Sequence, residues 1–84
     1  MAVIYVYSRR GCHLCEVLVD EMLPLLQGRI DVEVRDIDTN EDWQKAYDVR
    51  IPVVEYEGRV ISQYHLDKAK IVAIVAASAP PEGP

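Results

Sequence analysis

The chain has 84 residues, of which 50% are hydrophobic and 27% are charged, and its formal net charge at pH 7 is −5. This length fits a single domain with a small core, and the composition excludes disordered, collagen-like and repeat proteins. Domains that bind nucleic-acid phosphates are normally basic, so the excess of Asp and Glu argues against a nucleic-acid partner.

The apolar runs of the chain are too short for a membrane span. The two longest, residues 1–7 and 71–77, fall far below the roughly 20 residues that cross a bilayer. Basic residues follow the first run instead of preceding it, which is the wrong order for a secretory signal. We therefore expect a cytoplasmic protein with no membrane partner.

The first half of the chain predicts a strand, a helix and a second strand. Residues 2–7 are a short run of β-branched and aromatic side chains, typical of a central strand that is buried on both faces. From Cys12 the apolar residues recur at helical spacing, and this helix should end near residue 28, with Pro24 kinking it or ending it nearby. Residues 30–35 alternate between apolar and charged side chains, which predicts a half-exposed strand. Its neighbouring acidic side chains are expected on a solvated face: Asp31, Glu33, Asp36 and Asp38.

The second half predicts a short helix, a hairpin and a last helix. Thr39 is expected to cap a helix that carries Trp43 and stops before Pro52. A β-hairpin should follow, with strands at residues 52–56 and 59–62. The final helix is expected to run from residue 67 to about residue 77.

These elements predict one α/β domain with the order β-α-β-α-β-β-α. We expect the domain to span residues 1–77. Residues 78–84 are rich in proline, and we expect them to form a disordered tail.

Both cysteines lie in one motif, Gly11-Cys12-His13-Leu14-Cys15, where the first strand leads into the first helix. Cys12 should therefore meet the free N–H groups and the positive dipole end of that helix, which favour its thiolate and lower its pKa from a free value of about 8.5. Cys15 lies one turn further along, so that the two sulfurs can form a disulfide. The pattern predicts thiol–disulfide exchange, in which Cys12 attacks a substrate disulfide and Cys15 then attacks the mixed disulfide.

The cysteine pair allows other interpretations. A Gly-Cys turn at a helix start is not a core position, which argues against two simply buried thiols. Cys12 and Cys15 with one of the histidines supply fewer than the four ligands of a closed zinc site, and we expect no metal there. Two alternatives stay open. One is a carrier of a soft metal such as Cu(I), of the β-α-β-β-α-β type, and the other is a redox-inert binding module.

The segment Tyr7-Ser8-Arg9-Arg10-Gly11-Cys12-His13-Leu14-Cys15 resembles the active-site segment of glutaredoxins and of compact glutaredoxin-like proteins. Ile51-Pro52 resembles the Val-Pro segment of that family, and Glu57-Gly58-Arg59 resembles the turn after it. The resemblance covers residues 2–76. It implies a thioredoxin-like fold with a four-stranded mixed sheet flanked by three helices.

The resemblance also implies roles for individual residues. Cys12 would be the nucleophile and Cys15 the resolving residue. The Ile51–Pro52 bond would be cis and lie against the cysteines, and the backbone of Ile51 would pair with an extended substrate. Arg9 corresponds to a position that holds a glutathione carboxylate in glutaredoxins. The implied substrates are disulfides of proteins or small molecules.

The sequence departs from glutaredoxins where they bind glutathione. Glutaredoxins carry Gly-Gly after the hairpin, whereas this chain places the side chains of Gln63, Tyr64 and His65 there and leaves Asp67 as an acidic partner. His13 lies between the cysteines, where it is expected to contact the substrate. We therefore expect no resident cofactor and weak or absent activity with glutathione as co-substrate. We also expect the protein to be a monomer. We expect it to be reduced by a dithiol or by a partner of the thioredoxin-reductase type.

Overall fold

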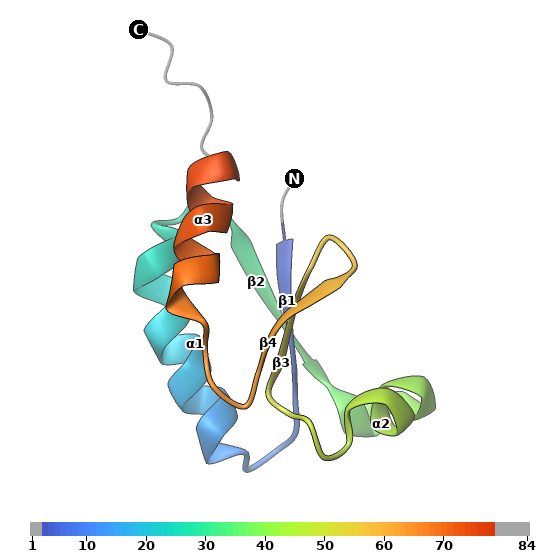
Figure 1. The fold of residues 1–84 in the computed structure, drawn as a ribbon. Coiled ribbons are helices and arrows are strands. Elements are labelled where there is room, and N and C mark those ends of the chain that lie inside the picture. The colour runs from blue at the N-terminus through green and yellow to red at the C-terminus, as the bar shows by residue number, and fades with distance from the viewer. Residues whose placement is uncertain (1–2, 79–84) are drawn as a thin grey trace, which may run out of the picture.

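The computed structural model describes residues 3–78, and they form one mixed sheet with helices on both of its faces (Figure 1). The elements follow in the order β1 (Val3–Ser8), α1 (His13–Leu26), β2 (Asp31–Asp36), the 3₁₀ turn η1 (Ile37–Thr39), α2 (Glu41–Tyr47), β3 (Val53–Tyr56), β4 (Arg59–Gln63) and α3 (Lys68–Ser78). The sheet order is β2-β1-β3-β4. β1 pairs parallel with β2 and antiparallel with β3, and β4 pairs antiparallel with β3. The predicted order of elements is confirmed.

The main core lies between the sheet and the two helices α1 and α3, which cover the same face (Figure 1). The apolar stripe of α1 supplies Leu18, Met22 and Leu26, each at most 2% exposed. These side chains pack against residues of β1, β3 and α3, namely Ile4, Val6, Val54, Ile71 and Val75. Burial of this stripe holds α1 on the sheet.

A second, smaller core lies under α2 on the opposite face. Tyr7 from β1 is 3% exposed, and its ring packs edge-on against Trp43, with centroids 5.5 Å apart, and at 4.5 Å from the ring of Tyr47. Trp43 is therefore a packing residue, as its amphipathic helix suggests. This cluster fixes α2 beside the carboxyl end of β1, where the cysteine motif begins.

The prediction that Thr39 caps α2 is wrong, because Asn40 does so. The Asn40 Oδ1 atom accepts hydrogen bonds from the backbone N–H groups of Asp42 and Trp43, at 2.9 and 3.2 Å. Thr39 belongs to η1, and its Oγ1 donates to the backbone oxygen of Asp36 at 2.7 Å. Thr and Asn both cap helices. The local sequence did not reveal the 3₁₀ turn η1, which moves the helix start by one residue.

The other element boundaries agree with the predictions to within one or two residues. α1 continues past Pro24 and ends at Leu26. Ser78, assigned to the tail from the sequence, is the last residue of α3, and the rest of the expected tail lies outside the described residues. Within residues 3–78, none of the helices has the length and apolar character that a membrane span requires.

Candidate active site

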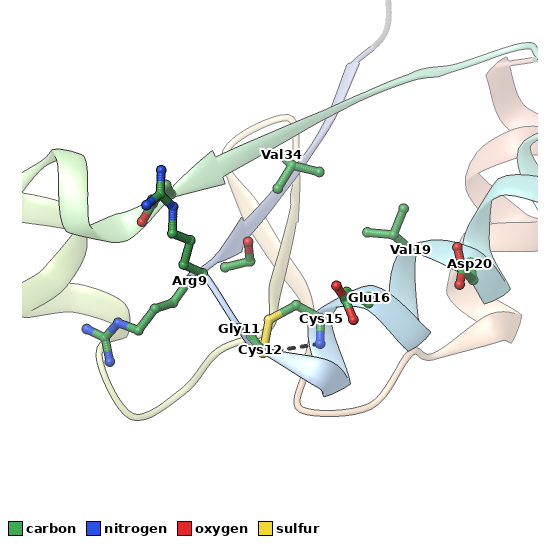
Figure 2. Close-up of a pocket in the computed structure, with 11 residues that line it drawn as sticks. Arg9, Gly11, Cys12, Cys15, Glu16, Val19, Asp20 and Val34 are labelled. Atoms are coloured by element: carbon green, nitrogen blue, oxygen red, sulfur yellow. Dashed lines mark hydrogen bonds between the residues drawn. A yellow bond between two sulfur atoms is a disulfide. The ribbon is translucent and has the colours of Figure 1, made fainter.

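The cysteine pair lies where β1 leads into α1 (Figure 2). Cys12 is the N-cap residue of α1, and Cys15 lies in its first turn. The two sulfurs form a disulfide, with Cα atoms 5.2 Å apart. Cys15 is only 4% exposed, whereas Cys12 is partly exposed. A reacting thiol can therefore approach Cys12 from solvent, while the body of the protein covers Cys15.

The local backbone directs the sulfur of Cys12 at the start of the helix. The Cys15 N–H donates to Cys12 Sγ at 3.2 Å, so that the sulfur takes the place of a capping oxygen. Gly11, just before it, has a φ of 74°, a conformation that residues with a Cβ rarely adopt. The glycine therefore permits the turn that brings Cys12 to the positive end of the helix dipole.

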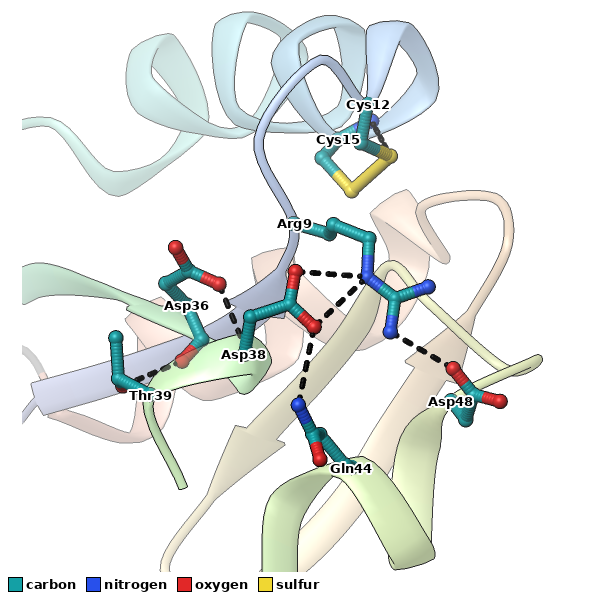
Figure 3. A network of polar contacts seen from close by, with 8 residues as sticks. All are labelled: Arg9, Cys12, Cys15, Asp36, Asp38, Thr39, Gln44 and Asp48. Atoms are coloured by element: carbon teal, nitrogen blue, oxygen red, sulfur yellow. Dashed lines mark hydrogen bonds and ion pairs between the residues drawn. A yellow bond between two sulfur atoms is a disulfide. The ribbon is translucent and has the colours of Figure 1, made fainter. Parts of the chain in front are cut away.

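Arg9 is bound on two sides by carboxylates of the chain itself (Figure 3). Its Nε donates to both oxygens of Asp38, at 3.2 and 3.1 Å, and its Nη2 donates to Asp48 at 2.8 Å. These hydrogen bonds, the one to Asp48 first, raise the pKa of Arg9 above its ordinary value. The backbone oxygen of Arg9 accepts from the N–H of Cys12 at 3.1 Å. Arg9 thus links the cysteine loop to η1 and to the end of α2.

The role of Asp38 and Asp48 was missed by sequence analysis, which placed Asp38 on a solvated strand face. Asp38 lies 29 residues from Arg9 along the chain, and Asp48 lies 39 residues away. Pairs at such separations leave no periodic signal. Only the fold brings the end of α2 next to the cysteine loop.

The Ile51–Pro52 peptide bond is cis, as the family resemblance implied. The antiparallel register pairs Tyr7 with Val53, so that Pro52 lies level with Ser8, where β1 enters the cysteine loop. Pro52 is fully buried, and Ile51 is half-buried against the second core. This segment therefore borders the site on the β3 side.

The last residue of β4 and the residue after it contact the chain that precedes Pro52. The Oε1 atom of Gln63 accepts from Arg50 Nε at 2.8 Å. Tyr64 adopts a left-handed φ of 64° and donates from its hydroxyl to the backbone oxygen of Val49 at 3.0 Å. These side-chain contacts occupy the stretch in which glutaredoxins carry paired glycines.

The two other candidate substrate-binding residues have different surroundings. His13 is 85% exposed in its side chain, and its Nδ1 atom lies 3.9 Å from Glu16 Oε2. Asp67 accepts from the backbone N–H of Lys70 at 3.2 Å and so stabilises the start of α3. Among residues 3–78 there is no group of three or more His, Cys, Asp or Glu side chains that could hold a metal ion.

A pocket of about 490 Å³ opens beside the disulfide, between α1 and the edge strand β2 (Figure 2). Its lining residues are Ser8, Arg9, Arg10, Gly11, Cys12, Cys15, Glu16, Val19, Asp20, Val34 and Asp36. Val34 is one of the apolar residues that alternate with charged ones in this strand, yet it is 53% exposed. α1 does not cover this end of β2, and the uncovered space is the pocket.

A family model described as "Glutaredoxin-like domain (DUF836)" matches residues 3–76 of the chain. No curated protein matches the sequence significantly.

Several solved structures are similar to this one. Protein Ne2328 from Nitrosomonas europaea has a TM-score of 0.75 at 36% identity, over 87% of this chain and 89% of that chain. Protein XcR50 from X. campestris has a TM-score of 0.66 at 28% identity, over 92% and 99% of the two chains. A mutant thioredoxin from Halobacterium salinarum, at 20% identity, has a TM-score of 0.58 over 98% of this chain and 78% of that one. The last similarity concerns the fold alone, which is that of thioredoxin.

Proposed function

The chain belongs to the family of glutaredoxin-like domains, and we propose that it is a thiol–disulfide oxidoreductase that works through Cys12 and Cys15. The asymmetry of the pair supports this proposal most strongly. A partly exposed sulfur at the helix N-cap is joined to a sulfur that the fold covers. Such a pair lets a substrate reach one sulfur and leaves the other for the internal step.

The proposed reaction begins with the reduced protein. The Cys12 thiolate attacks a substrate disulfide, forms a mixed disulfide and releases one substrate thiolate. Cys15, after losing its proton, attacks Cys12 Sγ and releases the second substrate thiolate. The two thiolates take up two protons, so that two electrons and two protons pass from the protein dithiol to the substrate. A Cys12–Cys15 disulfide, the state seen in the structure, would be the product of this sequence.

The start of α1 would assist the first step and the later release of Cys12 during re-reduction. Its free N–H groups, among them that of Cys15, stabilise negative charge on Cys12 Sγ. That charge is present when Cys12 attacks, and during re-reduction it returns when a second reductant thiol releases Cys12 from its mixed disulfide. On the other side, the backbone of Ile51 at the cis bond would pair with an extended stretch of the substrate.

We propose a dithiol or a protein partner of the thioredoxin-reductase type as reductant, in preference to glutathione. Arg9, which would have to bind a glutathione carboxylate, already carries two carboxylates of the chain. The side chain of Gln63 is hydrogen-bonded to Arg50, and that of Tyr64 to the backbone of Val49. They occupy the place where glutaredoxins offer backbone N–H groups to a glutathione carboxylate. Exchange between two pairs of thiols needs neither of these contacts.

The test is a single turnover with the reduced protein and a small peptide disulfide. We expect wild-type protein to release two peptide thiols and to re-form its disulfide. Cys12→Ser should lose the reaction, and Cys15→Ser should stop at a mixed disulfide that mass spectrometry detects as one added peptide. If the wild-type protein reduces no disulfide, or if Cys12→Ser keeps the wild-type rate, the proposal is wrong, and a redox-inert module becomes the better interpretation.

A further inference from the structure

The pocket beside the disulfide lies next to α1 and β2, whereas Pro52 borders the site on the β3 side. Both cysteines form part of its wall, and its other walls come from α1 and from the open edge of the sheet (Figure 2). We propose that it binds the side chain of a lysine or arginine that lies next to the reactive cysteine of a protein or peptide substrate. This inference rests on the proposed function and names a substrate class for it.

The pocket walls combine apolar and acidic side chains. Val19 and Val34 face it from α1 and β2, and Val34 is 53% exposed. Glu16 and Asp20 lie four residues apart on α1, on the helix side that also carries Cys15 and Val19. A lysine or arginine has an apolar stem and a charged head, and these two parts match the two kinds of wall.

The charges around the pocket favour a cation. Three carboxylates line it, those of Glu16, Asp20 and Asp36, against the guanidinium groups of Arg9 and Arg10. The charge of Arg9 is already compensated by Asp38 and Asp48. The remaining excess of negative charge attracts a basic side chain and repels an acidic one.

The position of the pocket fits a residue adjacent to the reacting cysteine. In the mixed disulfide, the substrate cysteine is bonded to Cys12 Sγ, at the pocket wall. The Cα atom of its neighbour is about 3.8 Å further along the peptide, and an extended chain places that side chain beside the site. The same mixed disulfide occurs when the protein is oxidised and when it is reduced, so the preference should hold in both directions.

The experiment compares three peptide disulfides that differ only at the residue next to cysteine, with Lys, Ala or Glu at that position. The reduced wild-type protein is mixed with each peptide, and the second-order rate constant is measured. We expect the Lys peptide to react about tenfold faster than the Glu peptide, a factor in line with one or two partly exposed ion pairs. The ratio should shrink in 1 M salt, where the Debye length is about 3 Å.

Charge-matched variants separate the pocket from the net charge of the protein. The double variant Glu16→Gln/Asp20→Asn should bring the Lys-to-Glu ratio close to one. Glu41→Gln/Asp42→Asn removes the same charge from the first turn of α2 and should keep the wild-type ratio. Because each ratio is taken within one variant, a change in thiol reactivity cancels.

The outcomes are distinguishable. If the wild-type protein reduces all three peptides at equal rates, the pocket does not select basic residues, although the proposed function stands. If both double variants lower the ratio equally, the preference comes from overall charge, and the pocket assignment is wrong. If no peptide is reduced, both the proposed function and this inference fail.

Discussion

At the scale of single residues, the exposure of the two sulfurs decides which thiol reacts with an outside reagent. In the reduced protein, we expect Cys12 to be alkylated faster than Cys15 at neutral pH, because Cys15 is 4% exposed. The rate at Cys12 should follow a pKa below about 8.5, the value of a free thiol. Alkylation with mass-spectrometric mapping across a range of pH measures both quantities.

The single-cysteine variants are the controls for that measurement. Cys15→Ser should keep the fast, low-pKa thiol, and Cys12→Ser should leave a slow one. Faster labelling of Cys15 in the wild-type protein would reverse the assignment of nucleophile and resolving residue.

Arg9 gives a second prediction at this scale, about the choice of reductant. Asp48→Ala removes the carboxylate at Nη2 and leaves that end of the guanidinium free for a glutathione carboxylate. We expect the ratio of glutathione-coupled to dithiothreitol-coupled turnover to rise about two- to fivefold, the range for one exposed ion pair. Asp42→Ala removes the same group from the first turn of α2 and should leave the ratio unchanged. Equal ratios in both variants would mean that Asp48 does not restrict glutathione.

Single residues of the site also differ in how far their roles can be predicted from the sequence. The motif of Cys12 and Cys15 was visible because the two cysteines lie three residues apart, where a strand pattern gives way to a helical one. The partners of Arg9 were invisible, since Asp38 and Asp48 reach it only through packing of α2 against β1. Electrostatic compensation between distant segments is a property of the fold.

At the scale of elements, variants at the start of α2 test the assignment of Asn40 as its N-cap residue. Asn40→Ala removes the acceptor for two backbone N–H groups, and we expect a loss of about 1 kcal/mol in the free energy of unfolding. Thr39→Ala removes a single hydrogen bond in η1 and should cost less. Chemical denaturation of both variants measures the difference, and a larger loss for Thr39→Ala would contradict the cap assignment.

The presence of α2 also bears on the alternative functions. Soft-metal carriers of the β-α-β-β-α-β type have no helix between their second and third strands, whereas here η1 and α2 lie between β2 and β3. The helix-start pattern at residues 39–42 and the stop before Pro52 predicted this helix, although not its capping residue. The pocket was not predictable in the same way, because alternation places Val34 on a face of β2 but does not say that α1 leaves a pocket beside it.

At the scale of the whole molecule, the order of elements followed from the residue patterns along the chain, while the four-stranded mixed sheet and the cis bond came from the family resemblance. The apolar run at residues 2–7 predicted a central strand, but periodicity does not say that β3 runs antiparallel beside it. That arrangement matters for function, because it places Pro52 at the same end of the sheet as Cys12. It also creates the second core, at which the hydroxyl groups of Tyr7 and Tyr47 donate to the carboxylate of Glu55, at 3.1 and 3.5 Å.

This second core predicts how stability depends on pH. The pKa of Tyr47 is raised, first by burial and then by the nearby carboxylate of Glu55. The pKa of Tyr7 is also raised by burial, although a hydrogen bond from Arg35 offsets part of this effect. In the unfolded chain tyrosines ionise near pH 10. Above that pH the folded state therefore holds more protons than the unfolded state, and the free energy of unfolding falls as pH rises. We expect Tyr7→Phe/Tyr47→Phe to flatten this fall in urea titrations at alkaline pH, after allowance for the hydrogen bonds lost at every pH. Equal slopes in both proteins would show that these two phenols do not govern alkaline unfolding.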